Sequence, residues 1–279
     1  MSEPLISVLI PAYNRADTIG QCIASAQAGG HENLEIIVSD NASTDGTAGV
    51  VAELATRDPR IILLQAGTNL GPLPNWKVCL DQATGDLIHW LWSDDWIAAG
   101  FYTRVLAAMS TIDAKMGMSA ATITDPEAGW WYTKYSHPSL VRKRDELLSL
   151  ASRGFDLPVS PAACLLPTAS VRKHFTISIP IVSGLDCNRR AIGCDQLMIM
   201  GAIHDSDGRC AFVPEPLAFF RDNPTSISVC TEASVRNAHY AWARSYWQRQ
   251  HGLPRSWRAF DFMRLIHDGR WMAAIRSML

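Results

Sequence analysis

Short apolar runs alternate with amphipathic segments along residues 6–97, in a repeating order of strand, loop and helix. The apolar runs are rich in branched residues and predict strands at Ile6–Ile10, Glu35–Ser39, Ile61–Leu64 and Leu87–Trp92. The segments between them carry apolar residues at helical spacing, as at Ile19, Cys22, Ile23 and Ala26. Connections this short predict right-handed crossovers and a parallel sheet with helices on both faces.

A polar cluster follows three of these predicted strands directly. The clusters are Pro11–Arg15, where we expect Pro11 to end the first strand, Asp40–Gly46 and Ser93–Asp95. Ligands of open α/β sheets bind beyond the carboxyl ends of the strands, so the clusters should meet in one crevice. The loop after the first strand has neither the Gly-rich dinucleotide pattern nor a P-loop, and NAD and ATP-hydrolysis functions lose their main support.

Carboxylates dominate this expected crevice, with Asp40 after the second strand and Asp94 and Asp95 after the fourth. A hard divalent cation such as Mg²⁺ or Mn²⁺ takes one or two carboxylates and completes its shell with water and phosphate oxygens. The sequence therefore favours a metal-assisted diphosphate site. Structural interpretations stay open: Asp40 could form an Asx turn, and Asp94 and Asp95 could cap a following helix.

Six segments in a fixed order carry a more specific signal. They are SVLIPAYNRADTI (Ser7–Ile19), EIIVSDNASTDGT (Glu35–Thr47), TNLGPLPNW (Thr68–Trp76), ATGDLIHWLWSDD (Ala83–Asp95), GCDQL (Gly193–Leu197) and VPEPLAFFR with SIS (Val213–Ser228). Together they resemble the GT-A-fold glycosyltransferases of family 2, which transfer sugars from nucleotide diphosphates. The resemblance covers most of residues 5–230.

The resemblance implies a role for each matching residue. The residues assigned to the donor are Pro11, Ala12, Tyr13, Arg15, Asp40, Asn69, Lys77, Ser93, Asp94 and Arg221. Among these, Asp40 would form a hydrogen bond with the nucleobase, and Asp94 would contact the ribose. Asp95 would bind the divalent metal. Asp195 falls where the family places the catalytic base that deprotonates an acceptor hydroxyl in an inverting displacement. A structural role for Asp195 stays open, because the helix dipole stabilises any acid at the start of a helix. Asp186 is the alternative candidate for the catalytic base.

The implied fold is α/β GT-A, a Rossmann-like, mostly parallel sheet flanked by helices, with a helical C-terminal extension. We expect a catalytic domain at 1–230, with a nucleotide-sugar half (1–110) and an acceptor half (111–230), followed by a basic, Trp-rich region at 231–279. The implied reaction moves a sugar from a UDP- or dTDP-type donor to a glycan or lipid-linked acceptor in cell-surface polysaccharide synthesis. The alternatives are a nucleotidyltransferase and a catalytically silent binder; Trp92 and Cys194, which stand where the family often has acids, favour the latter.

Residues 111–230 are less regular than the first half. A helix is predicted near Asp195–His204, and Phe212–Phe220 resembles an edge strand interrupted by Pro214 and Pro216. His89 is expected to be a hydrogen-bonded core residue, and His204 and His239 surface residues. No histidine cluster shows the sequence spacing of a metal site.

The tail differs in charge from the rest of the chain. Residues 236–279 hold eight Arg, two Asp and no Lys, a local charge of +6 within a chain of net charge −2, and tryptophans interleave with the arginines. One interpretation is a segment that lies in an anionic membrane interface, which suits a lipid-linked acceptor. The alternative is a helical bundle that packs its tryptophans on the body, with solvated or paired arginines. Nucleic acid is not an expected partner.

Cysteine use and hydropathy bear on the compartment. The seven cysteines stand singly, without a CxxC pair, and predict reduced, mostly buried thiols. No apolar run approaches the roughly 18 residues of a membrane span, and the N-terminal segment lacks a signal-peptide pattern. We therefore expect a cytoplasmic protein. If the basic tail lies in an anionic membrane interface, it would bring the protein to the inner face of the cell membrane.

Overall fold

The computed structural model describes residues 3–125, 130–134, 141–142, 160–176, 178–206, 209–223, 226–253, 261–262, 265–267 and 269–278. The strands of this part are β1 (Ile6–Ala12), β2 (Leu34–Asp40), β3 (Ile61–Gln65), β4 (Leu87–Trp90), β5 (Trp96–Ile97), β6 (Met116–Asp125), β7 (Trp130–Lys134), β8 (Val141–Arg142), β9 (Cys164–Pro167) and β10 (Cys210–Arg221). Its helices are α1 (Ile19–Gln27), α2 (Thr47–Ala55), α3 (Pro72–Gln82), α4 (Phe101–Thr111), α6 (Thr168–His174), α7 (Cys187–Arg190), α8 (Cys194–Asp205), α9 (Ile227–Cys230), α10 (Ala233–Gln250) and α12 (Trp271–Met278).

The strands form one mixed sheet in the order β3-β2-β1-β4-β9-β6-β10-β5. The first four strands pair in parallel, as the alternating sequence pattern predicts. The second half adds β9 antiparallel to β4, and β6 parallel to β10. Every residue of β1 is buried, which explains its continuous apolar sequence. The arrangement is the α/β GT-A fold that the sequence predicts.

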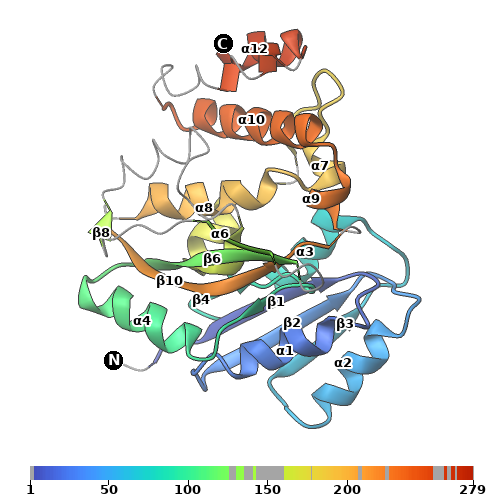
Figure 1. Ribbon diagram of the computed structural model, residues 1–279, viewed down its shortest axis with the longest axis vertical. Coiled ribbons are helices and arrows are strands. Elements are labelled where there is room, and N and C mark those ends of the chain that lie inside the picture. Colours follow the sequence, from blue (N-terminus) through green and yellow to red (C-terminus); the bar gives the residue numbers. More distant parts are fainter. Residues whose placement is uncertain are drawn as a thin grey trace.

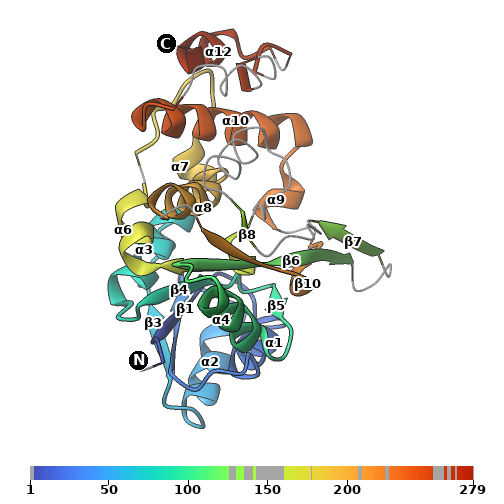
Figure 2. The ribbon, with the colours of Figure 1, turned by 90° about the vertical axis from the view of Figure 1, so that its left-hand side faces the viewer.

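Helices cover both faces of the sheet and divide the apolar core into two clusters (Figure 1). On one face, α1, α2 and α4 pack over residues such as Ile10 and Ile36. On the other face, α3, α6 and α8 pack over residues such as Leu9 and Trp90. Two further helices, α10 and α12, stack outward from α8, as both views show (Figures 1 and 2).

Two expectations about proline were wrong. β1 does not end at Pro11 but continues to Ala12, where it still pairs with β2. On its other side β4 pairs with β1 only as far as Leu9, so no hydrogen bond to β4 is lost where Pro11 lacks an N–H. β10 is not an edge strand, since it lies between β6 and β5. Its prolines are accommodated where the pairing with β6 shifts register, on both sides of Pro216.

The described C-terminal residues pack on the body of the protein. Trp242 and Trp247 are buried in the same core cluster as α8, and Trp242 Nε1 donates to the carbonyl oxygen of Pro180 at 2.8 Å. Arg244 forms a buried ion pair with Asp261 at 2.5 Å. These contacts favour the helical-bundle interpretation for this part; Trp257 lies outside the described residues. No helix within the described ranges combines the length and apolar character needed to cross a bilayer.

Candidate active site

The loops after β1 and β2 are joined by hydrogen bonds at the carboxyl edge of the sheet. The register places Ala12 opposite Asp40. Asn14, whose φ of 51° lies in the left-handed region that Asn tolerates, donates its N–H to Ser43 Oγ at 2.8 Å. Its side-chain Oδ1 accepts from the Thr44 N–H at 2.9 Å. The first two polar clusters therefore form one surface, as the parallel topology predicts.

Asp40 is buried at this edge, with 2% of its surface exposed. Its Oδ2 accepts the N–H of Ser43 at 3.2 Å, which accounts for the turn-forming role. Its Oδ1 is buried and has no hydrogen-bond partner within the described structure. Buried polar atoms are normally paired, so this oxygen is an exception; it is closed to solvent, and Asp40 does not line the cleft described below.

Asp94 and Asp95 follow β4, but no helix begins behind them. The chain continues into β5, and α4 starts only at Phe101 after Gly100. The helix-capping interpretation of the two acids is therefore wrong. Asp95 is 6% exposed, and its Oδ1 accepts the N–H of Arg221 at 3.0 Å. The Arg221 side chain also donates from Nε to the Asp94 carbonyl oxygen at 3.1 Å, which ties β10 to this turn.

The two adjacent carboxyl groups interact electrostatically. Burial, followed by the charge of Asp94, raises the pKa of Asp95 well above its ordinary value, and Arg221 opposes the shift. Arg15 faces Asp94, with Nε 3.6 Å from Oδ2. Asp94 and Asp95 both line one cleft, and carboxylate oxygens are the protein ligands that Mg²⁺ and Mn²⁺ prefer, so this donor set fits such an ion.

Asp195 lies in the first turn of α8, which follows Gly193 in the left-handed region at φ 90°. Its Oδ2 accepts a hydrogen bond from Tyr240 at 3.2 Å, and its Oδ1 is buried without a partner among the described residues. Burial raises the pKa of Asp195 to about 7, and hydrogen bonding by the Gln196 backbone and by Tyr240 opposes this shift. The competing acid, Asp186, caps α7 by accepting the Arg189 N–H at 2.9 Å.

A cleft of about 620 Å³ brings Asp94, Asp95 and Asp195 together. Seven of the predicted site residues line it, namely Pro11, Arg15, Ser93, Asp94, Asp95, Asp195 and Arg221. The other five, which are Ala12, Tyr13, Asp40, Asn69 and Lys77, do not belong to its lining. Among these, Asn69 Oδ1 accepts from Asn41 at 3.0 Å in the loop before α3. Lys77 Nζ lies 2.6 Å from Asp81 Oδ2 on the exposed side of α3.

Several lining residues carry no motif and were not predicted. Arg190, Arg236 and Tyr240 come from α7 and α10, elements whose place beside the cleft depends on tertiary packing. The basic bias of the tail was the only signal for Arg236. Trp92, which stands where the family often has an acid, packs on Trp76 with ring centroids 4.6 Å apart and forms an aromatic wall.

The histidine expectations had mixed outcomes. His89 is a buried core residue as predicted: its Nε2 donates to the Ala162 carbonyl oxygen at 2.9 Å, and its Nδ1 accepts from Tyr102 at 2.9 Å. The surface prediction for His239 was wrong. Its ring is buried, donates from Nδ1 to the Val235 carbonyl oxygen at 2.7 Å, and accepts the Asp186 N–H at 3.2 Å.

Comparison with known proteins gives the family. The sequence profile described as glycosyl transferase family 2 matches residues 7–164, and the chain belongs to this family. A Campylobacter jejuni protein named GalNAc(5)-diNAcBac-PP-undecaprenol beta-1,3-glucosyltransferase is 39% identical over 104 residues, which are 37% of this chain and 34% of that protein. The matched stretches span 34–40% of the length of the first curated relatives.

Solved structures support the same fold. Staphylococcus aureus TarS in complex with UDP-GlcNAc superposes with a TM-score of 0.69 at 17% identity, over 95% of this chain and 71% of that one. The mannosyltransferase PcManGT from Pyrobaculum calidifontis, in complex with GDP-Man and Mn²⁺, gives a TM-score of 0.54 at 14% identity, over 99% of this chain and 74% of that one.

Proposed function

We propose that this protein is a metal-dependent, inverting glycosyltransferase that moves a sugar from a nucleotide-diphospho-sugar to a glycan or lipid-linked acceptor in cell-surface polysaccharide synthesis. The observation that carries the proposal is the common cleft of Asp94, Asp95 and Asp195. The first two acids follow β4 in the parallel half of the sheet, and the third begins a helix of the second half. Carboxylates for a metal and a candidate base thus face one space.

The donor is assigned to the first half of the chain, residues 1–110. Following the resemblance, Asp40 would hydrogen-bond the nucleobase, which requires its buried Oδ1 to become accessible, and Asp94, which lines the cleft, would contact the ribose. Asp95, together with Asp94, would hold Mg²⁺ or Mn²⁺. Such an ion, when bound, neutralises charge that develops on the leaving diphosphate. A UDP-type donor is favoured by the fold shared with TarS, whose structure contains UDP-GlcNAc.

The base is assigned to Asp195. Asp195 lines the cleft, Tyr240 holds its Oδ2, and its buried Oδ1 would accept the proton of an acceptor hydroxyl that reaches it. A pKa of about 7 matches a general base that works near neutral pH. Because the base must start deprotonated, turnover should fall as the pH drops below about 7.

The acceptor is assigned to residues 111–230 with help from the tail region, 231–279. Arg190 and Arg236 line the cleft on the side of Asp195, and guanidinium groups recognise phosphate well. This suits an acceptor with a lipid diphosphate, like the one named in the Campylobacter relative. A lipid-linked acceptor would bring the protein to the inner face of the membrane, where the exposed Ile275 and Arg276 of α12 are available for contact.

The test compares Asp195→Asn with Asp186→Asn. We expect Asp195→Asn to lower slow donor hydrolysis and sugar transfer by at least about 100-fold, because proton acceptance is lost, while UDP affinity changes less than about threefold. Asp186→Asn serves as the matched control and should keep activity within about threefold. The measurements are UDP release, product analysis by mass spectrometry, and UDP calorimetry.

Three results would contradict the proposal. Donor hydrolysis absent from the wild type would favour the silent binder, and a nucleotidyl product would favour the nucleotidyltransferase. Equal losses of donor hydrolysis and sugar transfer in Asp195→Asn and Asp186→Asn would show that Asp195 is not the catalytic base.

A further inference from the structure

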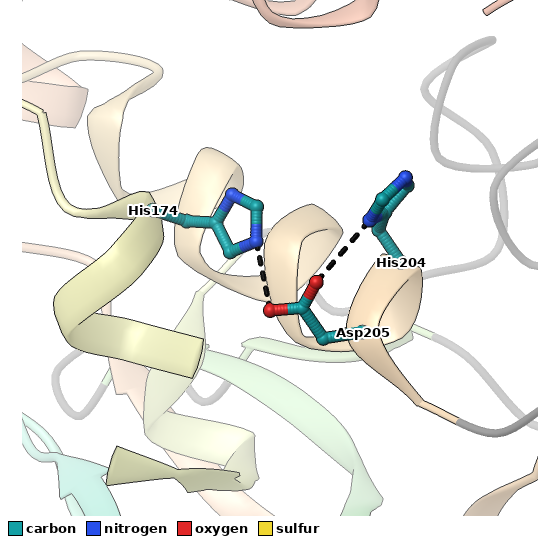
Figure 3. Close-up of side chains that lie close together, drawn as sticks. All are labelled: His174, His204 and Asp205. Carbon is teal, nitrogen blue, oxygen red and sulfur yellow. Dashed lines mark hydrogen bonds and ion pairs between the residues drawn. The ribbon is translucent and has the colours of Figure 1, made fainter. Parts of the chain in front are cut away.

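A second group of potential metal ligands lies away from the cleft. His174 ends α6, His204 and Asp205 end α8, and His251 follows α10; we call these four residues the histidine cluster. The ligand atoms of the first three lie within 4.8 Å of one another. Figure 3 shows both rings directed at the Asp205 carboxylate, with His174 Nε2 at 3.0 Å from Oδ2 and His204 Nδ1 at 3.3 Å from Oδ1.

The absence of a sequence motif did not exclude this cluster. The sequence shows no histidine cluster with metal-site spacing, and this stays true, because the four residues come from α6, from α8 and from the residue after α10. Only His204 and Asp205 are neighbours in sequence, and the other two lie 30 and 47 positions from His204. Metal-site spacing is readable only when the ligands share one element or loop.

The spacing of the rings fits a tetrahedral ion. An imidazole bound through one nitrogen places its centroid about 3.2 Å from Zn²⁺, so two such rings have centroids about 5 Å apart. The His251 centroid lies 5.1 Å from that of His174 and 5.1 Å from that of His204, and the latter two are 6.1 Å apart. His251 is not among the three residues whose ligand atoms lie within 4.8 Å of one another, so its ring would have to turn towards the ion to act as a fourth ligand.

Outer contacts orient these ligands. His251 Nδ1 donates to the carbonyl oxygen of Trp247 at 2.9 Å, which leaves Nε2 as its lone-pair nitrogen. Ser170 Oγ donates to Asp205 Oδ2 at 2.9 Å. Ring-to-carbonyl and hydroxyl-to-carboxylate bonds are the usual outer-shell partners of metal ligands. Trp247 stacks on His251 at 4.0 Å and gives the cluster an apolar wall.

The competing explanation is a hydrogen-bonded anchor without metal. Lys173 Nζ lies 2.7 Å from Asp205 Oδ1, so this carboxylate is already paired with a cation. An anchor of this kind needs one histidine, whereas three imidazole rings gather here. The Lys173 side chain is 59% exposed, so it can leave when another cation binds.

We propose that His174, His204, Asp205 and His251 bind one Zn²⁺-class divalent ion that fastens α6 and α10 to the C-terminal end of α8. Asp195 begins the same helix, ten residues or about 15 Å away along its axis. The ion would therefore be structural and separate from the donor metal, and the proposal stands whether or not the transferase function is correct. It would help to hold the helix that carries the candidate base.

The test uses metal alone as the probe. Protein freed of metal with EDTA is titrated with ZnCl₂ by calorimetry, without nucleotide, and its thermal unfolding is followed. We expect one Zn²⁺ per chain, a higher Tm with Zn²⁺, and at least about tenfold weaker binding in His204→Ala. His267→Ala, which removes an exposed histidine outside the cluster, is the matched control and should bind like the wild type.

Two further arms keep the result decisive. Asp95→Ala should retain the Zn²⁺ site, and Lys173→Ala should tighten it several-fold, because a competing cation has been removed. Wild-type protein loaded with Co²⁺ should show the intense visible absorption of tetrahedral coordination, a readout that requires no variant to fold. Wild-type Zn²⁺ binding no tighter than that of His204→Ala, or equal loss in His267→Ala, would overturn the proposal.

Discussion

Two aspartates in this protein each bury an oxygen atom that lacks a hydrogen-bond partner in the described structure. They are Asp40 and Asp195, at opposite halves of the fold. Leaving a buried acceptor unsatisfied costs on the order of 1–3 kcal/mol, a cost that folding alone does not require. Asp195 lines the cleft, so an acceptor hydroxyl that reaches its Oδ1 would supply the missing donor, whereas Asp40 lies outside the lining of the cleft.

His89 shows the opposite case, a polar residue whose bonds are complete and whose role is structural. Burial lowers the pKa of His89 to about 4. An unfolded histidine titrates near 6.5, so the unfolded chain binds a proton first as the pH falls, and stability is lost from about pH 6.5 downward. This group alone should remove about 3 kcal/mol of the free energy of unfolding between pH 7 and pH 4.

Urea unfolding of the wild type and His89→Gln at pH 7 and pH 4 measures this contribution. The variant should be less stable at pH 7 but lose less stability on acidification. An identical loss in both proteins would show that His89 is not the titrating group.

At the residue scale, the sequence predicted side chains that belong to a motif and missed those placed by packing. Asp94, Asp95 and Asp195 follow recognisable segments and line the cleft. Tyr240, which donates to Asp195, lies 45 positions later on a helix without a motif. The surface prediction for His239 failed because its helix packs against α7, a contact that composition does not encode.

At the scale of elements, the approach of α6 to α8 depends on a glycine. A Cβ added at Gly201 of α8 would lie 2.2 Å from Cγ of His174, far inside van der Waals contact. Gly201→Ala should therefore force the two helices apart and lower the free energy of unfolding by about 1–3 kcal/mol. It should also weaken Zn²⁺ binding by the histidine cluster.

Gly49→Ala in α2 is the matched control, because nothing lies within 4 Å of an added Cβ there. This variant should be more stable by about 0.5–1 kcal/mol, the usual gain of alanine over glycine inside a helix. Chemical unfolding of both variants beside the wild type makes the measurement. Equal stability of Gly201→Ala and the wild type would mean that α6 and α8 are less tightly packed than described.

Periodicity predicted the elements of the first half because each combines an apolar run with a turn signal. β1 to β4 fall close to the predicted ranges, and α1 contains the positions whose spacing predicts a helix, Ile19, Cys22, Ile23 and Ala26. The prediction of an edge position for β10 was wrong because β5 pairs with it on one side. β5 has only two residues and carries no periodic pattern that would predict it. The prolines of β10 were real signals of irregular pairing, but not of an edge.

Across the whole molecule, one apolar cluster runs from the sheet through α8 into α10. It connects residues as distant in sequence as Leu9, Trp90 and Trp242. The C-terminal helix α10 therefore packs against α8, the helix whose first turn carries Asp195. This long-range packing could not be predicted from local pattern, and the sequence left the membrane alternative open.

The central claim is that acids from separate strand and helix ends meet around one nucleotide diphosphate and its divalent ion. Calorimetric titration with UDP, with and without Mn²⁺, tests it most directly. We expect Mn²⁺ to tighten UDP binding at least about tenfold in the wild type and in the control Asp81→Ala, whose side chain lies on the exposed side of α3. Asp95→Ala should lose that gain. Mn²⁺-independent binding, or an Asp95→Ala variant that responds to Mn²⁺ like the wild type, would contradict the account.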